Sequence, residues 1–115
     1  MMKAIIKELD ESFGSILPTF QENDELVLYK KLNLLGCYYT EHFEEEKAGE
    51  IIKVIEAIYK RKYLFVCNAI ENEFLSVLAL HSKPSELSHL LESLPESLWV
   101  VYIKVLLETL KNNKL

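Results

Sequence analysis

Apolar residues between positions 25 and 46 recur with a period that a helix satisfies and a strand does not. Leu28, Leu32, Leu35, Tyr39 and Phe43 follow one another at intervals of four, three, four and four. In a helix with 3.6 residues per turn, this spacing places all five along one side. No stretch of alternating apolar and polar residues is bounded by turn dipeptides, as a hairpin strand would require. The sequence therefore predicts a long amphipathic helix over residues 25–46.

The same periodicity recurs between short segments that contain Gly, Pro, Ser or Asn. Together these segments predict helices over residues 3–13, 25–46, 50–60, 63–80, 85–92 and 96–110. Asp24 is expected to cap the second helix, and Gly49 is expected to mark the break after it. Gly36 lies inside that helix, where glycine costs about 1 kcal/mol relative to alanine. It therefore indicates either a bend or the close approach of another backbone.

Length and composition fit one ordered domain. The chain has 115 residues, of which half are apolar, and it contains only three Gly and three Pro. One domain of roughly 100–200 residues is the usual organisation at this length. We expect residues 1–115 to form a single all-α domain, either a bundle or a short helical-repeat-like array of about six helices.

The charge balance and the apolar runs exclude several classes of protein. The chain carries 13 basic and 18 acidic residues, and Arg61 is its single arginine. Nucleic-acid binding needs a basic surface, so we expect no nucleic-acid partner. The N-terminus has no signal-peptide core, and the longest apolar run, residues 98–103, is far short of the roughly 20 residues that cross a membrane. Cys37 and Cys67 are too few for a disulfide framework. We therefore expect a cytoplasmic protein that does not enter the membrane.

Three polar residues, Glu71, Asn72 and Glu73, interrupt the otherwise apolar stretch 67–81. On a helix they lie away from the centre of the apolar stripe that contains Ile70 and Phe74. They can face water, or they can line a groove that meets a partner. The two carboxylates stand two positions apart and diverge by about 200°, so they do not converge on one bond as a catalytic pair would.

Motifs for catalysis and metal binding are incomplete. Glu86 and His89 form one Glu-x-x-His, but a di-iron bundle needs a second copy and two further carboxylates. Neither His42 nor His81 has a glutamate three residues before it. There is no glycine-rich phosphate loop, nucleophile elbow or Cys-x-x-Cys. We expect no enzyme activity, no metal and no cofactor.

An acidic run at residues 41–46, EHFEEE, is either a solvated face or a patch that attracts a basic protein. The candidate partner-binding residues are therefore Glu41, Glu44, Glu45, Glu71, Asn72 and Glu73.

Three segments carry a resemblance to a known family: LYKKLNLLGCYYTEHF, IIKVIEAIYKRKYLFVCNAIENEFLSVL and LLESLPESLWVVYIKVL. Its most recognisable part is Asn-Ala-Ile, then Phe-Leu, then Leu, within residues 68–78. Over about residues 26–107 the chain resembles a bacterial family of small all-helical proteins catalogued as a domain of unknown function. The resemblance implies an all-helical fold and carries no activity.

The leading hypothesis is a non-catalytic protein-interaction module whose acidic surface binds a protein partner, with a basic protein as the expected kind. An immunity- or antitoxin-like protein that masks a basic toxin is its most specific form. The alternative is a small-molecule or metal-binding bundle whose interior polar groups include Glu71, Asn72 and His42. A homodimer formed through the apolar helix 96–110 is a further hypothesis, because wide apolar faces are unusual on a small monomer.

Overall fold

Every regular element in the described part of the chain is a helix. The computed structural model describes residues 2–81, 85 and 87–112. Its elements are α1 (Met2–Phe13), α2 (Asp24–His42), α3 (Glu46–Tyr59), α4 (Leu64–Ala69), the π-helix η1 (Ile70–Leu75), α5 (Ser76–His81), α6 (Leu87–Ser93) and α7 (Glu96–Asn112). Because α4, η1 and α5 follow one another without a break, they form one continuous helix. The predicted all-α bundle is confirmed.

The start of α2 is capped one residue earlier than the sequence predicted. The side-chain oxygen of Asn23 accepts a hydrogen bond from the backbone N–H of Leu26 at 3.0 Å. Asp24 and Glu25 instead occupy the first turn, where negative charge interacts favourably with the positive end of the helix dipole. The prediction that Asp24 is the cap was wrong, because the preceding asparagine satisfies the free backbone donor equally well.

The boundary between α2 and α3 lies before Gly49, and not at it. Helix α2 ends at His42, and the N–H of Glu45 donates to the carbonyl of His42 at 2.9 Å in the turn that follows. Glu46 then opens α3, with Gly49 inside that helix. Glutamates are unfavourable at the C-terminal end of a helix and favourable in the first turn of the next. The acidic run is therefore split, with Glu41 in the last turn of α2, Glu44 and Glu45 in the turn between the helices, and Glu46 at the start of α3.

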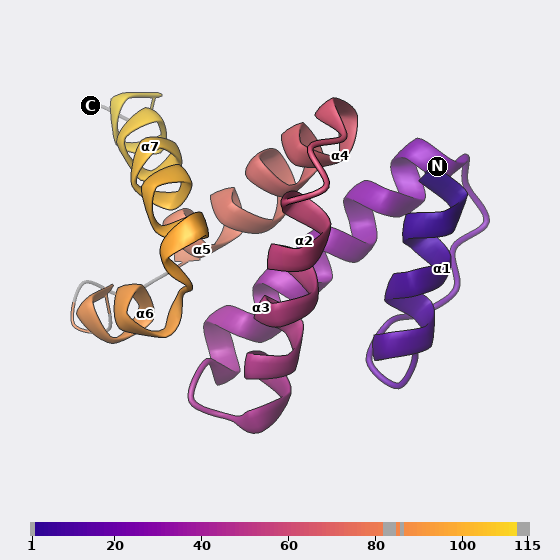
Figure 1. Ribbon diagram of the computed structural model, residues 1–115, viewed down its shortest axis with the longest axis horizontal. Coiled ribbons are helices and arrows are strands. Elements are labelled where there is room, and N and C mark those ends of the chain that lie inside the picture. The colour runs from indigo at the N-terminus through magenta and orange to yellow at the C-terminus, as the bar shows by residue number, and fades with distance from the viewer. Residues whose placement is uncertain (1, 82–84, 86, 113–115) are drawn as a thin grey trace.

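Helix α2 lies at the centre of the bundle, where it contacts α1, α3 and the continuous helix α4–η1–α5 (Figure 1). Its predicted stripe is buried, with Leu28, Leu32, Leu35 and Tyr39 each at most 1 % exposed. A Cβ built at Gly36 would lie 3.0 Å from the carbonyl oxygen of Phe74. The glycine thus permits the close approach of a second backbone.

The π-helix η1 contains the three polar residues Glu71, Asn72 and Glu73. Its wider turn is marked by the N–H of Ser76, which donates to the carbonyl of Glu71 five residues earlier. The Ser76 hydroxyl donates to the same carbonyl at 3.1 Å. Ile70 and Leu75, five positions apart, are both fully buried. A π turn therefore keeps the apolar side of this helix on the core across the polar interruption.

Polar contacts attach the outer helices to this centre. Helix α1 and the loop after it are fixed by the buried ammonium group of Lys31, which donates to Asp10 and to the carbonyl of Pro18 at 3.3 Å. At the other end, the hydroxyl of Tyr39 meets that of Ser93 at 2.5 Å and holds α6. Helices α1 and α7 lie at opposite ends of the bundle (Figure 1). Within the described residues, no helix combines the length and apolar character needed to cross a membrane.

Candidate binding groove

An open groove of about 520 Å³ lies between the loop before α2, the first half of α2 and η1. It is lined by Pro18, Phe20, Leu26, Tyr29, Lys30, Asn33, Leu34 and Glu73. We refer to these eight residues as the Glu73 groove. Three separate parts of the chain supply them, so the groove exists only in the folded protein.

The walls of the Glu73 groove are largely apolar and remain exposed. Leu26 and Leu34 are 40 % and 37 % exposed, although leucine is usually buried. The ring of Tyr29 stacks on Phe65, with centroids 5.9 Å apart, which extends the apolar surface to α4. Contiguous exposed apolar surface of this kind is typical of binding sites.

Two polar wall residues of the groove are engaged by neighbours outside it. The Tyr29 hydroxyl donates to the carboxylate of Glu25 at 3.0 Å. The ammonium group of Lys30 forms an ion pair with Glu22 and lies 5.3 Å from the centre of the Phe20 ring. Burial, and then the nearby carboxylates of Glu25 and Glu73, raise the pKa of Tyr29. The polar atoms of Tyr29 and Lys30 are therefore already engaged, and these residues contribute to the groove mainly through the shape of their side chains.

Among the described residues, Glu73 is the one carboxylate in the groove lining, and it is half-buried. Burial raises its pKa above the ordinary carboxyl range. Within the described part of the chain, no lysine, arginine or histidine lies close enough to form an ion pair with it. A carboxylate taken partly out of water without a counter-charge is unfavourable. The groove thus contains an uncompensated negative charge.

The neighbouring Glu71 and Asn72 lie in different surroundings. The Tyr59 hydroxyl donates to Glu71 at 2.8 Å, and the ammonium group of Lys104 lies 3.8 Å from its other carboxylate oxygen. Burial first, and then this hydrogen bond with Glu71, raise the pKa of Tyr59. Asn72 is exposed between the two glutamates. The π turn therefore divides the polar residues, with only Glu73 in the groove.

Glu41, Glu44 and Glu45 lie at the far end of α2, where with His42 and His89 they surround a smaller hollow of about 240 Å³. All three glutamates are exposed. His42 contacts Glu45 through Nδ1 at 2.6 Å and Glu41 through Nε2 at 3.8 Å. Leu34, the groove-lining residue nearest this end of α2, lies about 10 Å from residue 41 along the helix axis, at 1.5 Å per residue. The six candidate residues thus form two separate areas and not one acidic surface.

The interior polar groups of the metal- or ligand-binding hypothesis are not gathered together. Asn72 is exposed, and His42 lies at the end of α2, away from the pair of Glu71 with Tyr59. Glu86 of the Glu-x-x-His pattern and the side chain of His81 fall outside the described residues. Among the residues described, no group of three or more His, Cys, Asp or Glu side chains is placed to hold a metal ion.

Burial raises the pKa of both cysteine thiols, Cys37 and Cys67. A raised pKa disfavours the thiolate, which is the reactive form of cysteine. Each half-buried thiol also donates a hydrogen bond within the chain, Cys37 to the side-chain oxygen of Asn33 and Cys67 to the carbonyl of Tyr59.

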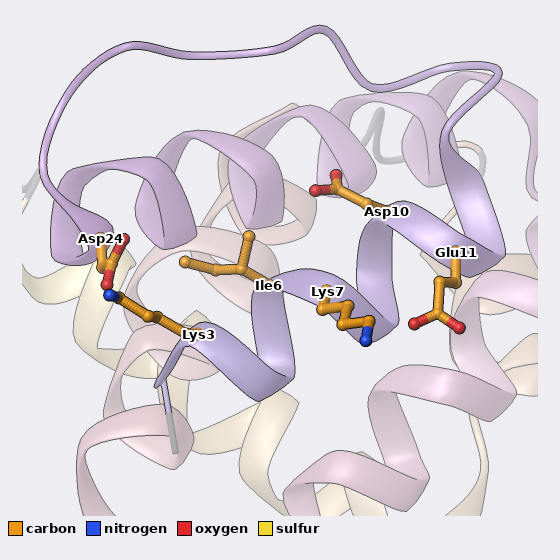
Figure 2. Close-up of a pocket in the computed structure, with 6 residues that line it drawn as sticks. All are labelled: Lys3, Ile6, Lys7, Asp10, Glu11 and Asp24. Carbon is orange, nitrogen blue, oxygen red and sulfur yellow. The ribbon is translucent and has the colours of Figure 1, made fainter.

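A further hollow of about 360 Å³ runs beside α1. Figure 2 shows Ile6 pointing between α1 and α2, with Lys3 reaching toward Asp24 at the start of α2. Its lining mixes both signs of charge, and Asp10 already pairs with Lys31. Because this hollow is open and carries charges of both signs, it is a weaker candidate for ligand binding than the Glu73 groove.

Sequence reasoning identified Glu73 but not the residues around it. Leu26 and Leu34 lie off the buried stripe of α2, so the periodicity of that stripe does not include them. Two leucines outside the main stripe of an amphipathic helix were the available signal for a second apolar face. Phe20 lies in the loop, where no periodicity predicts its position.

The fold and the groove define a small all-α bundle with an open apolar groove that contains one uncompensated carboxylate. The chain belongs to a family described as a domain of unknown function (DUF7674), whose model matches residues 6–110. This match confirms the resemblance to a domain of unknown function and extends it to α1. No curated protein and no solved structure matches the chain in the same comparisons.

Proposed function

We propose that this protein is a non-catalytic interaction module whose Glu73 groove binds an apolar segment of a protein partner that carries a lysine or arginine side chain. The observation that carries the proposal is the position of Glu73, a half-buried carboxylate without an ion-pair partner among the described residues, in an apolar groove.

The energetics favour a cationic anchor. An incoming ammonium or guanidinium group would supply the counter-charge that Glu73 lacks, and hydrogen bonds to charged groups contribute about 1.5–3 kcal/mol. The ring of Tyr29 would add about 0.5–1 kcal/mol through cation–π contact at an exposed site, whereas the ring of Phe20 already lies beside the ammonium groups of Lys30 and Lys31. Apolar neighbours of the basic residue would cover Leu26 and Leu34, at about 25 cal/mol per Å² removed from water.

A non-catalytic role agrees with the polar groups in the groove. Tyr29 is engaged with Glu25, and Lys30 is paired with Glu22. Among the described lining residues, Glu73 therefore has no adjacent acid, base or nucleophile that is free to act with it. This arrangement is suited to recognition and not to proton transfer.

The net charge of −5 supports a basic partner, because an acidic surface attracts cationic proteins over long range. Glu41, Glu44 and Glu45 at the far end of α2 add to that field without lining the groove. An immunity- or antitoxin-like protein is the specific form of the proposal, in which a basic toxin supplies the lysine- or arginine-bearing segment.

A second candidate function is the binding of a small amphipathic cation. The observation in its favour is the groove volume of about 520 Å³, since small-molecule sites span roughly 300–1,000 Å³. A long-chain amine would place its ammonium group at Glu73 and its chain along Leu26 and Leu34. It would then raise the melting temperature of the protein in proportion to the logarithm of its concentration.

The proposal is tested with three fluorescent peptides that differ at one central residue, which is Lys, Glu or norleucine between leucines. We expect wild type to bind the lysine peptide most tightly in a polarisation titration. Glu73→Gln should weaken that binding about tenfold, which corresponds to about 1.4 kcal/mol. Glu71→Gln is the matched control, because Glu71 is two residues away and already paired with Tyr59. It should leave the affinity unchanged.

Equal affinity for the three peptides, or equal loss in both variants, would contradict the role of Glu73. Decylamine and decanol, compared in a thermal-shift assay, separate the second candidate from the first. Affinity capture from cell lysate with wild type and Glu73→Gln then identifies the protein that the groove retains.

A further inference from the structure

Helix α7 presents a second exposed apolar face, which the Glu73 groove does not include. Its inner side is buried through Leu98, Tyr102 and Val105. On the outer side, Val100, Ile103, Leu107 and Leu110 are 72 %, 40 %, 61 % and 61 % exposed, and Trp99 flanks them at 42 %. We refer to these five residues as the outer face of α7. Five large apolar side chains on one exposed helix face are unusual for a monomer.

The spacing of the outer face is that of a helix-packing seam. Val100, Ile103, Leu107 and Leu110 follow at intervals of three, four and three. This alternation is the pattern with which two helices pack side by side through interlocking side chains. It therefore fits another helix along α7 better than it fits a compact ligand.

The charges at the two ends of α7 indicate which helix would pack along its outer face. Glu96 stands at the N-terminal end of the outer face and Lys111 at the C-terminal end, and both are exposed. A second copy of α7 running antiparallel places Lys111 of each copy beside Glu96 of the other. A parallel copy would instead bring each charge next to itself, which is unfavourable.

The apolar residues match in the same register. When Glu96 of one copy lies beside Lys111 of the other, Val100 lies opposite Leu107, and Ile103 lies next to its own copy. The first two pairs share a midpoint between Ile103 and Lys104, and the two copies of Ile103 meet within one residue of it, so a single two-fold axis there relates the whole set, as closed dimers require.

A hollow at the N-terminal end of α7 completes the match. It has a volume of about 320 Å³ and is lined by Leu91, Leu94 and Trp99 together with Glu92 and Glu96. Residues 97 and 110 are about 20 Å apart along the axis, at 1.5 Å per residue. In the antiparallel register, Leu110 of the other copy therefore reaches the apolar wall of this hollow, and the adjacent Lys111 reaches its acidic rim.

Lys104 does not oppose this arrangement, although it lies near the midpoint. Its ammonium group is 3.8 Å from the carboxylate of Glu71 in the same chain, which offsets its charge. We propose that the outer face of α7 binds a second copy of this chain in an antiparallel, two-fold arrangement. The Glu73 groove stays open in this dimer, since it is formed by the loop before α2, α2 and η1.

Sedimentation equilibrium tests the proposal over loading concentrations from about 1 µM to about 1 mM, which spans weak and moderate affinities. We expect wild type to form a dimer within this range. Leu107→Glu should weaken the dimer at least tenfold. Leu64→Glu is the matched control, because Leu64 is 77 % exposed on α4, away from the outer face. It should leave the dimer unchanged, and circular dichroism melts establish that both variants are folded.

Charge reversal tests the direction of packing. Glu96→Lys and Lys111→Glu should each weaken the dimer about tenfold, and the double variant should restore it. A monomer at every concentration, or a dimer that Leu107→Glu leaves intact, would overturn the proposal. Failure of the double variant to recover would overturn the antiparallel register. A monomer that cosediments with vesicles of phosphatidylcholine and phosphatidylglycerol would assign the outer face to a lipid surface instead.

Discussion

Replacing Gly36 with alanine tests the close contact between α2 and η1 in the core. A Cβ at this position would lie 3.0 Å from the carbonyl oxygen of Phe74 and 3.2 Å from the Cβ of Val77. The first of these atoms is backbone in a fully buried part of η1, so it cannot rotate away as a flexible side chain would. Helix α2 and η1 would have to separate by a few tenths of an ångström.

The expected cost follows from two opposing terms. Overpacking of a core costs about 1–3 kcal/mol, whereas alanine in a helix interior recovers about 1 kcal/mol relative to glycine. The difference predicts a net loss of about 1 kcal/mol in the free energy of unfolding for Gly36→Ala. For a chain of this length, such a loss lowers the melting temperature by about 4 °C.

Gly49→Ala is the matched control, because Gly49 also lies inside a helix. Apart from its own helix and chain neighbours, no atom of the described residues lies within 4 Å of a Cβ built there. Only the difference in helix propensity remains, so Gly49→Ala should raise the free energy of unfolding by about 1 kcal/mol. Urea unfolding with an unchanged slope is the assay. If Gly36→Ala were stabilised as much as Gly49→Ala, the argument for close helix packing at Gly36 would be refuted.

Three further predictions concern polar groups. Asp10→Ala should cost about 1–3 kcal/mol by removing the counter-charge of the buried Lys31 ammonium group, whereas Lys31→Met should be close to neutral because it removes the charge and keeps the bulk. If chemical unfolding showed that Lys31→Met loses more stability than Asp10→Ala, the importance of that ion pair would be contradicted. Burial raises the pKa of Glu73 in the folded state. Between the ordinary carboxyl pKa and this raised pKa, the folded chain therefore binds more protons than the unfolded chain. The free energy of unfolding consequently falls as the pH rises through that interval. Glu73→Gln should remove the fall in melting temperature with rising pH that Glu73 causes. If the variant and wild type showed the same dependence of melting temperature on pH, the raised pKa of Glu73 would be contradicted. Tyr59→Phe should lose about 1 kcal/mol by leaving Glu71 without its hydroxyl donor, and a double-variant cycle with Glu71→Gln should show that the two effects are not additive.

The helices were predictable because each must bury a stripe of apolar residues with a period close to 3.6. The stripe from Leu28 to Tyr39 is buried as expected, and so are Ile70 and Phe74. The adjacent Tyr38 and Tyr39 could not both face the core, and only Tyr39 is fully buried. The ends of the helices were less predictable. Asn23 and Asp24 are equally good N-cap residues when considered alone. Gly49 is a typical helix-ending residue, but α2 already ends before it, at the acidic residues that precede it.

The sequence by itself determined the fold class and the buried sides of the helices, because periodicity and burial are properties of each segment. It also drew attention to Glu71 and Glu73 as polar residues in an apolar helix. Only the tertiary structure decided that Glu71 pairs with Tyr59 while Glu73 faces an apolar groove, since that depends on a π turn and on side chains supplied by α2 and its loop. It also decided that one side of α7 stays exposed. A segment specifies how much apolar surface it has, but the number of its neighbours in the fold decides how much of that surface is covered.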